Sequence, residues 1–98
     1  MTVSLFHRIQ VQKFDEWLNP DPDQVAEMMK SQGASSFTLS RNVNDPNILM
    51  IHMQFPDENT AKTYMDFYTK AAEERHGDTA TTQEWWLGMD VEGYSGQL

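Results

Sequence analysis

RNVNDPNILMIHMQF, residues 41–55, sets a turn rich in Asn, Asp and Pro ahead of eight mostly apolar residues. The turn formers predict a hairpin between strands at 36–41 and 48–55. In the second strand, one side carries Leu49, Ile51, Met53 and Phe55, and the other carries Met50, His52 and Gln54. One side is wholly apolar and the other only partly polar, which is typical of a central strand covered on both faces.

Two further segments alternate with the period of a half-buried strand. In residues 3–11, Leu5, His7, Ile9 and Val11 oppose Phe6, Arg8 and Gln10. In residues 83–91, Trp85, Leu87, Met89 and Val91 oppose Trp86, Gly88 and Asp90, after a polar loop at 78–82. The chain therefore has four predicted strands.

In the two long intervals between these strands, apolar residues recur with the spacing of a helix. After a separate turn at 14–18, Asp21 is suited to cap a helix that begins at Pro22 and ends at Gly33. A second helix follows Asp57 and Glu58 and ends at Gly77. Its apolar stripe consists of Ala61, Tyr64, Met65, Tyr68, Ala71 and Ala72.

The resulting order, βαββαβ, predicts an α+β, ferredoxin-like domain over residues 1–98 with both helices on one face of a four-stranded antiparallel sheet. The other face would expose Phe6, Met50 and Trp86, and such a patch normally marks an interface. We therefore expect a homodimer in which two copies close sheet against sheet. The tail, residues 92–98, is expected to be mobile or to lie over a neighbour.

Charge and composition exclude several classes of function. The net charge is -8, from fifteen Asp and Glu against seven Lys and Arg, which argues against nucleic acid as a partner. The chain contains no cysteine and no two histidines at a chelating i, i+4 spacing, so a dedicated metal site is not expected. No apolar run is long enough for a membrane span or a signal peptide, and we expect a cytoplasmic protein.

Several short motifs resemble the dimeric α/β-barrel superfamily, especially its small proteins similar to antibiotic biosynthesis monooxygenases. The motifs are Phe14-Asp15-Glu16-Trp17, Gly33, Ser40-Arg41 followed by Asn44-Asp45-Pro46-Asn47, and Phe55-Pro56-Asp57 with Ala61 and Lys62. The resemblance implies a dimeric α/β barrel and spans most of the chain. It says little about activity, because the fold hosts oxygenases, isomerases, haem enzymes and proteins without a known role.

The resemblance also implies a pocket between the sheet and the helices. In its haem-degrading and quinone-forming members, the pocket is lined by a polar residue on strand one, an aromatic residue on strand three and a group on the second helix. The matching positions here are His7, Phe55 and His76. The strand-one asparagine and strand-three tryptophan of the haem-degrading members are absent, so we expect no haem and no other cofactor.

His7 shares its strand face with Leu5 and Ile9, and it is the candidate catalytic residue, as a general base or as an orienting donor. The alternative is a core histidine with one satisfied hydrogen bond. Four aromatic residues, Tyr64, Tyr68, Phe55 and Trp85, are candidates for binding a flat aromatic substrate. Their alternative role is packing of the core.

A second candidate cluster lies on the opposite face of the sheet. It consists of His52, Arg8 and Gln54, and it would either bind a small anion or fix the register of the dimer. His76 lies at the end of the predicted second helix, four residues after Ala72 on the same face. Capping of the helix end or exposure to solvent is the alternative to a role in the site.

Two functions follow from the sequence. The first is a homodimeric, cofactor-independent enzyme resembling a monooxygenase, which acts on a small aromatic or polyketide-like compound through His7, Tyr64 and Tyr68. The second is a non-catalytic dimer that binds a small ligand or a protein. An enzyme requires a cavity with convergent polar groups, whereas a binding protein would show these side chains packed solid or an apolar surface turned outward.

Overall fold

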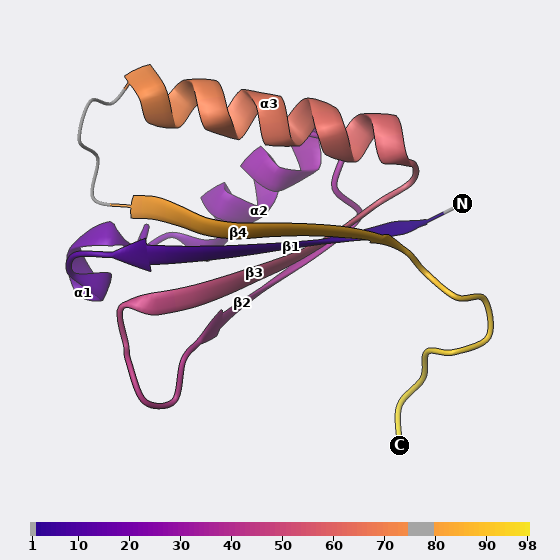
Figure 1. Ribbon diagram of the computed structural model, residues 1–98, viewed down its shortest axis with the longest axis horizontal. Coiled ribbons are helices and arrows are strands. Elements are labelled where there is room, and N and C mark those ends of the chain that lie inside the picture. Colours follow the sequence, from indigo (N-terminus) through magenta and orange to yellow (C-terminus); the bar gives the residue numbers. More distant parts are fainter. Residues whose placement is uncertain (1, 75–79) are drawn as a thin grey trace.

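The computed structural model describes residues 2–74 and 80–98, and its centre is a four-stranded antiparallel sheet. The strands are β1 (Val3–Val11), β2 (Ser36–Arg41), β3 (Ile48–Phe55) and β4 (Ala80–Met89), in the order β2-β3-β1-β4. The helices are α1 (Phe14–Trp17), α2 (Pro22–Ser31) and α3 (Glu58–Glu74). Figure 1 shows α2 and α3 together on one face of the sheet. This arrangement confirms the predicted ferredoxin-like α+β fold.

The core lies between this covered face and the helices. β1 pairs with β3 on one side and with β4 on the other, so Leu5 has Met53 and Leu87 as its lateral neighbours. The side chains that β1 and β3 turn toward the helices are buried, including Leu5, Ile9, Met53 and Phe55 at 0% exposure. The predicted alternation in both strands and the central position of β3 are therefore confirmed.

The ends of α2 follow the predicted local signals. Asp21 caps the helix, because its Oδ1 accepts hydrogen bonds from the backbone N–H groups of Asp23 at 3.1 Å and Gln24 at 3.2 Å. Gly33, with φ of +92°, ends the helix in the left-handed region that glycine tolerates. A side chain at this position would also collide with Thr60 at the start of α3.

The predicted limits of β4 were wrong at both ends. The strand begins at Ala80, inside the segment predicted as a loop, and ends at Met89, so Val91 lies beyond it and is 68% exposed. Arg8 pairs with Glu84 but Ile9 pairs with Thr82, which leaves Gln83 as the extra residue of a β-bulge. The bulge reverses the alternation, so Ala80 and Thr82 join Trp85 on the covered face.

The opposite face of the sheet, which we call the open face, has no helix of the described residues over it (Figure 1). It presents Phe6 and Met50, both half-buried, and Trp86, which is 55% exposed. The indole of Trp86 lies against Gly88, where even a Cβ would collide with the ring. The chain after β4 continues on this side as an exposed segment without helix or strand, and its mobility stays a prediction.

Two phenylalanines provide a matched test of this core. Phe55 is fully buried and packs near Tyr64, with ring centroids 5.7 Å apart, whereas Phe67 is 46% exposed on α3. We expect Phe55→Ala to lower the free energy of unfolding by about 3–5 kcal/mol. Phe67→Ala is expected to cost less than about 1 kcal/mol. Urea unfolding of both variants checks this, and equal losses would contradict the placement of the core.

Candidate functional site

His7 lies at the centre of the covered face, because alternation along β1 turns its side chain toward α3. The side chain has 0% exposure. Its imidazole stacks on the indole of Trp85, with centroids 3.6 Å apart and planes 5° from parallel, and meets the ring of Tyr68 at 4.5 Å and 83°. The imidazole that β1 supplies is thus packed against one aromatic ring from β4 and one from α3.

The two ring nitrogens of His7 differ in their surroundings. Nε2 lies 2.8 Å from Oγ1 of Thr82, in hydrogen-bond contact. Nδ1 is buried and has no hydrogen-bond partner among the described residues. Burial lowers the pKa of His7 from 6.5 to about 4, since the charged imidazolium would lose its hydration. His7 is therefore neutral at pH 7.

A groove of about 410 Å³ opens beside this cluster, between the end of α3 and the start of β4. Its walls are formed by Tyr68, Thr69, Ala72 and Glu73 of α3 and by Ala80, Thr81, Thr82 and Trp85 of β4. Three of these residues, Tyr68, Thr82 and Trp85, also contact His7. The imidazole is thus separated from the groove by one layer of side chains.

The four predicted aromatic positions fall into two groups. Tyr68 and Trp85 line the groove and meet at right angles, with centroids 5.7 Å apart. Tyr64 is 3% exposed and Phe55 is fully buried, and neither lines the groove. Burial raises the pKa of Tyr64 to about 12, with a smaller contribution from Tyr68. A ligand in the groove would therefore meet Tyr68 and Trp85, while Tyr64 and Phe55 fill the core.

The second predicted cluster shares the open face but does not converge on one point. Gln54 is part of a chain of hydrogen bonds: its Nε2 donates to Oδ2 of Asp90 at 3.2 Å, and its Oε1 accepts from Ser36 at 2.8 Å. His52 stacks on Phe6 at 4.3 Å, and its Nε2 is buried with no partner in the described chain. Arg8 pairs with Met50, two residues along β1 from the pair of Phe6 and His52.

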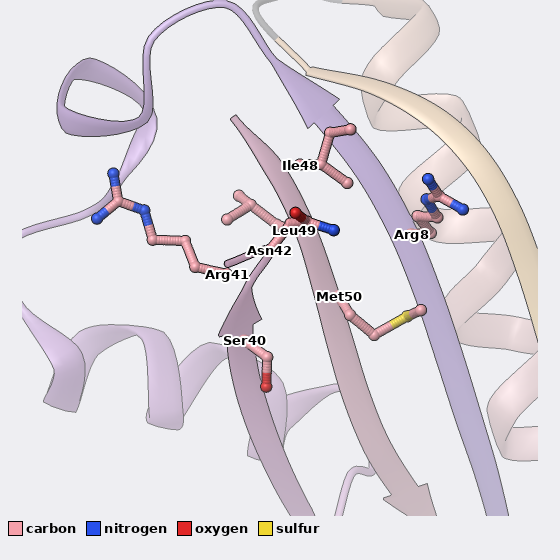
Figure 2. Close-up of a pocket in the computed structure, with 7 residues that line it drawn as sticks. All are labelled: Arg8, Ser40, Arg41, Asn42, Ile48, Leu49 and Met50. Carbon is pink, nitrogen blue, oxygen red and sulfur yellow. The ribbon is translucent and has the colours of Figure 1, made fainter. Parts of the chain in front are cut away.

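Arg8 borders a second, smaller groove of about 260 Å³ near the β2–β3 hairpin. Ser40 and Asn42 add polar groups to its lining, and Ile48 and Met50 add apolar ones. Figure 2 shows the guanidinium of Arg41 extending away from Arg8. It lies 3.8 Å from the ring of Phe14, and its Nε donates to the carbonyl oxygen of Pro46 at 3.2 Å. Arg41 also lines the groove, but its guanidinium is engaged with Phe14 and Pro46, whereas Arg8 is exposed to solvent.

Three other expectations concern His76, a metal site and a membrane-spanning helix. His76 lies outside the described residues. Within residues 2–74 and 80–98, no three His, Asp or Glu side chains are grouped so that they could hold a metal ion. The described helices are all too short or too polar to cross a membrane.

Thr82 is the residue of this cluster that sequence reasoning missed. The polar character of residues 78–82 indicated a loop, and a period-2 pattern that starts at Gln83 cannot include a position beyond a bulge. The signal available in the sequence was the pair Thr81-Thr82, since threonine is enriched in strands.

Comparison with known proteins places the fold but not the activity. No family model matches the chain, and no curated protein does. Among solved structures, a candidate antibiotic biosynthesis monooxygenase from Deinococcus radiodurans is similar, with a TM-score of 0.68, 13% identity and 99% of each chain covered. A second candidate of the same name, from Chloroflexus aurantiacus, has a TM-score of 0.56 and 13% identity over 97% of this chain and 98% of its own.

Rv0793 from Mycobacterium tuberculosis is also similar, with a TM-score of 0.53 and 10% identity over 97% of this chain and all of that one. These likenesses confirm the ferredoxin-like fold that the sequence resemblance implied. At such identities they do not carry an activity across.

The low pKa of His7 predicts a dependence of stability on pH. The unfolded chain binds a proton at His7 near pH 6.5, whereas the folded chain does so only near pH 4. As the pH falls from 6.5 toward 4, the unfolded state binds this proton before the folded state does, so the free energy of unfolding decreases. The free energy of unfolding rises again when the pH is raised. We expect His7→Phe, which keeps a flat ring beside Trp85, to remove about 3 kcal/mol of this pH dependence.

Urea unfolding of both proteins between pH 4.5 and 7.5 measures this difference. His52 and His76 are present in both proteins, so their contributions cancel in the comparison. Parallel pH curves for the wild type and the variant would show that His7 is not buried as a neutral group.

Proposed function

We propose that this protein is a homodimer that binds a flat aromatic compound in the groove between α3 and β4 and oxidises it with O₂ in the manner of a cofactor-independent monooxygenase. The observation that carries the proposal is the groove itself. Tyr68, Trp85 and Thr82 line it, and the neutral imidazole of His7 contacts all three from behind. The names of the similar structures from Deinococcus radiodurans and Chloroflexus aurantiacus agree with this reaction class.

The reaction needs a substrate that supplies its own electrons. In a three-ring ketone such as anthrone, the methylene group opposite the carbonyl loses both hydrogens and gains one oxygen atom. The second oxygen atom of O₂ leaves with these hydrogens as water, and the product is the quinone. The protein's share of the work is to orient the ring system, to exclude competing water and to stabilise charge on the ketone oxygen.

The surroundings of His7 favour an orienting role over that of a general base. A histidine with a pKa near 4 is a weak proton acceptor at pH 7. Its Nε2 is occupied by Thr82, and none of its surface is open to the groove. His7 instead holds Trp85 and Thr82 in position through stacking and one hydrogen bond.

The burial of His7 also favours the second candidate function, a binding protein without turnover. In that case the groove would take up a flat ligand and release it unchanged. Ligand binding without uptake of O₂ distinguishes this function from the first.

The homodimer is supported by the open face. Phe6 and Trp86 meet there with ring centroids 5.5 Å apart, and Met50 lies on the same face. Neither α2 nor α3 lies over this face. A twofold pairing of open faces would remove these side chains from water and would make the same contacts twice.

The dimer is tested by sedimentation of two matched variants. We expect Trp86→Asp to convert the dimer to monomers, because it places two carboxylates in the apolar centre of the interface. Phe67→Asp makes the same change of charge on the exposed surface of α3 and is expected to leave the dimer intact. A wild-type protein that sediments as a monomer at every concentration would overturn the pairing.

The activity is tested with anthrone, by O₂ uptake and by absorbance of the quinone, against the rate in buffer. We expect Ala72→Phe to lower the catalysed rate by roughly tenfold or more, since the added ring occupies the groove. Ala26→Phe, on the exposed surface of α2, is the matched control and should retain the rate. No acceleration over buffer, or equal rates for both variants, would refute an oxygenase reaction in this groove.

A further inference from the structure

Thr82 is the polar group through which the His7 cluster reaches the groove. It lines the groove, is exposed, and has its Oγ1 2.8 Å from the buried Nε2 of His7. No other hydrogen bond of its hydroxyl is formed within the described residues. The hydroxyl therefore has one side fixed by the protein and one side available to a ligand.

Two proton arrangements fit the distance between Thr82 and His7. In the first, Nε2–H donates to the hydroxyl oxygen, and Nδ1 carries only a lone pair. In the second, the hydroxyl donates to Nε2, and Nδ1 carries the hydrogen. Because Nδ1 is buried without a partner, the second arrangement would leave an N–H donor unpaired in the core, and orphaned buried N–H groups are rarer than under-satisfied acceptors. The first arrangement is therefore favoured.

This arrangement gives the Thr82 hydroxyl a defined direction. Its oxygen accepts the hydrogen of His7 Nε2, so its own hydrogen is left to donate into the groove. The β-bulge at Gln83 is what brings the hydroxyl to this side, because without it Thr82 would share the open face with Glu84 and Trp86. The bulge and the neutral imidazole together produce one oriented donor beside Trp85.

We propose that Thr82 is the group that selects the ligand, by donating a hydrogen bond to a carbonyl or neutral phenol oxygen at the edge of a flat ring system stacked in the groove. The inference rests on the proposed function for the identity of the ligand. Glu73 on the opposite wall adds a negative charge, so a carboxylate-bearing ligand is disfavoured relative to an uncharged ketone. In the proposed oxidation, the same donor would stabilise negative charge on the ketone oxygen.

The arrangement of protons is tested first, without a ligand. Long-range ¹H–¹⁵N spectra of the histidine rings, with His7→Phe to assign the signal, should show His7 neutral with its hydrogen on Nε2. Thr82→Ser should keep this pattern, and Thr82→Val, which removes the acceptor, should lose the single tautomer. A hydrogen on Nδ1 in the wild type would overturn the inference, whatever the protein binds.

The ligand is tested with fluorenone and fluorene, flat three-ring probes that differ in the carbonyl group and do not require turnover. From fluorescence titrations, we expect the ratio of fluorenone affinity to fluorene affinity to fall roughly fivefold in Thr82→Val, as expected for loss of one hydrogen bond. Thr82→Ser should keep the wild-type ratio. Thr69→Val removes a hydroxyl from the same groove, one already bonded to the Met65 carbonyl, and should also keep the ratio.

The outcomes separate the two proposals. If neither probe binds the wild type, ligand binding in the groove is refuted, and the selecting role of Thr82 with it, even if the hydrogen is found on Nε2. If both probes bind but Thr82→Val keeps the wild-type ratio, the groove is a ligand site and the selecting role of Thr82 is wrong. A ratio that falls equally in Thr69→Val would also contradict that role.

Discussion

The structure depends on one constraint: this four-stranded sheet carries apolar side chains on both faces, and the helices of the described residues cover one of them. α2 and α3 cover the face that carries Leu5, Met53 and Phe55, all fully buried. The core therefore lies on that side, and the groove is lined by the end of α3 and the start of β4. The open face keeps Phe6 and Trp86 in contact with water, which is why a second copy of the chain enters the proposal.

A local irregularity connects this architecture to the candidate chemistry. The bulge in β4 changes which residues face the helices, and it places Thr82 against His7 at the edge of the groove. Burial keeps the imidazole neutral, so it can hold the hydroxyl without carrying a charge into the core. The fold by itself would not indicate this contact between Thr82 and His7, because the similar structures are only 10–13% identical to the chain.

The sequence predicted the parts of the structure that follow from short-range patterns. Alternation located β1, β2 and β3, and the cap at Asp21 and the left-handed Gly33 located α2. It could not locate the start of β4, because a bulge breaks the period on which the prediction relies. It placed Arg8, His52 and Gln54 on one face correctly, but only the register shows that each has different neighbours. The sequence also could not show that Phe55 and Tyr64 pack in the core while Tyr68 and Trp85 line the groove, because this depends on how α3 lies against β4.

The most direct test of the two-faced sheet compares the indole N–H signals of Trp85 and Trp86 in the presence of a soluble gadolinium chelate. Trp85 lies on the covered face and Trp86 on the open face, and in a single chain Trp86 is 55% exposed. If a second copy covers the open face, the chelate should broaden the Trp86 signal strongly in dilute protein and only weakly in concentrated protein, while Trp85 changes little. Strong broadening of Trp86 at every protein concentration would contradict the account.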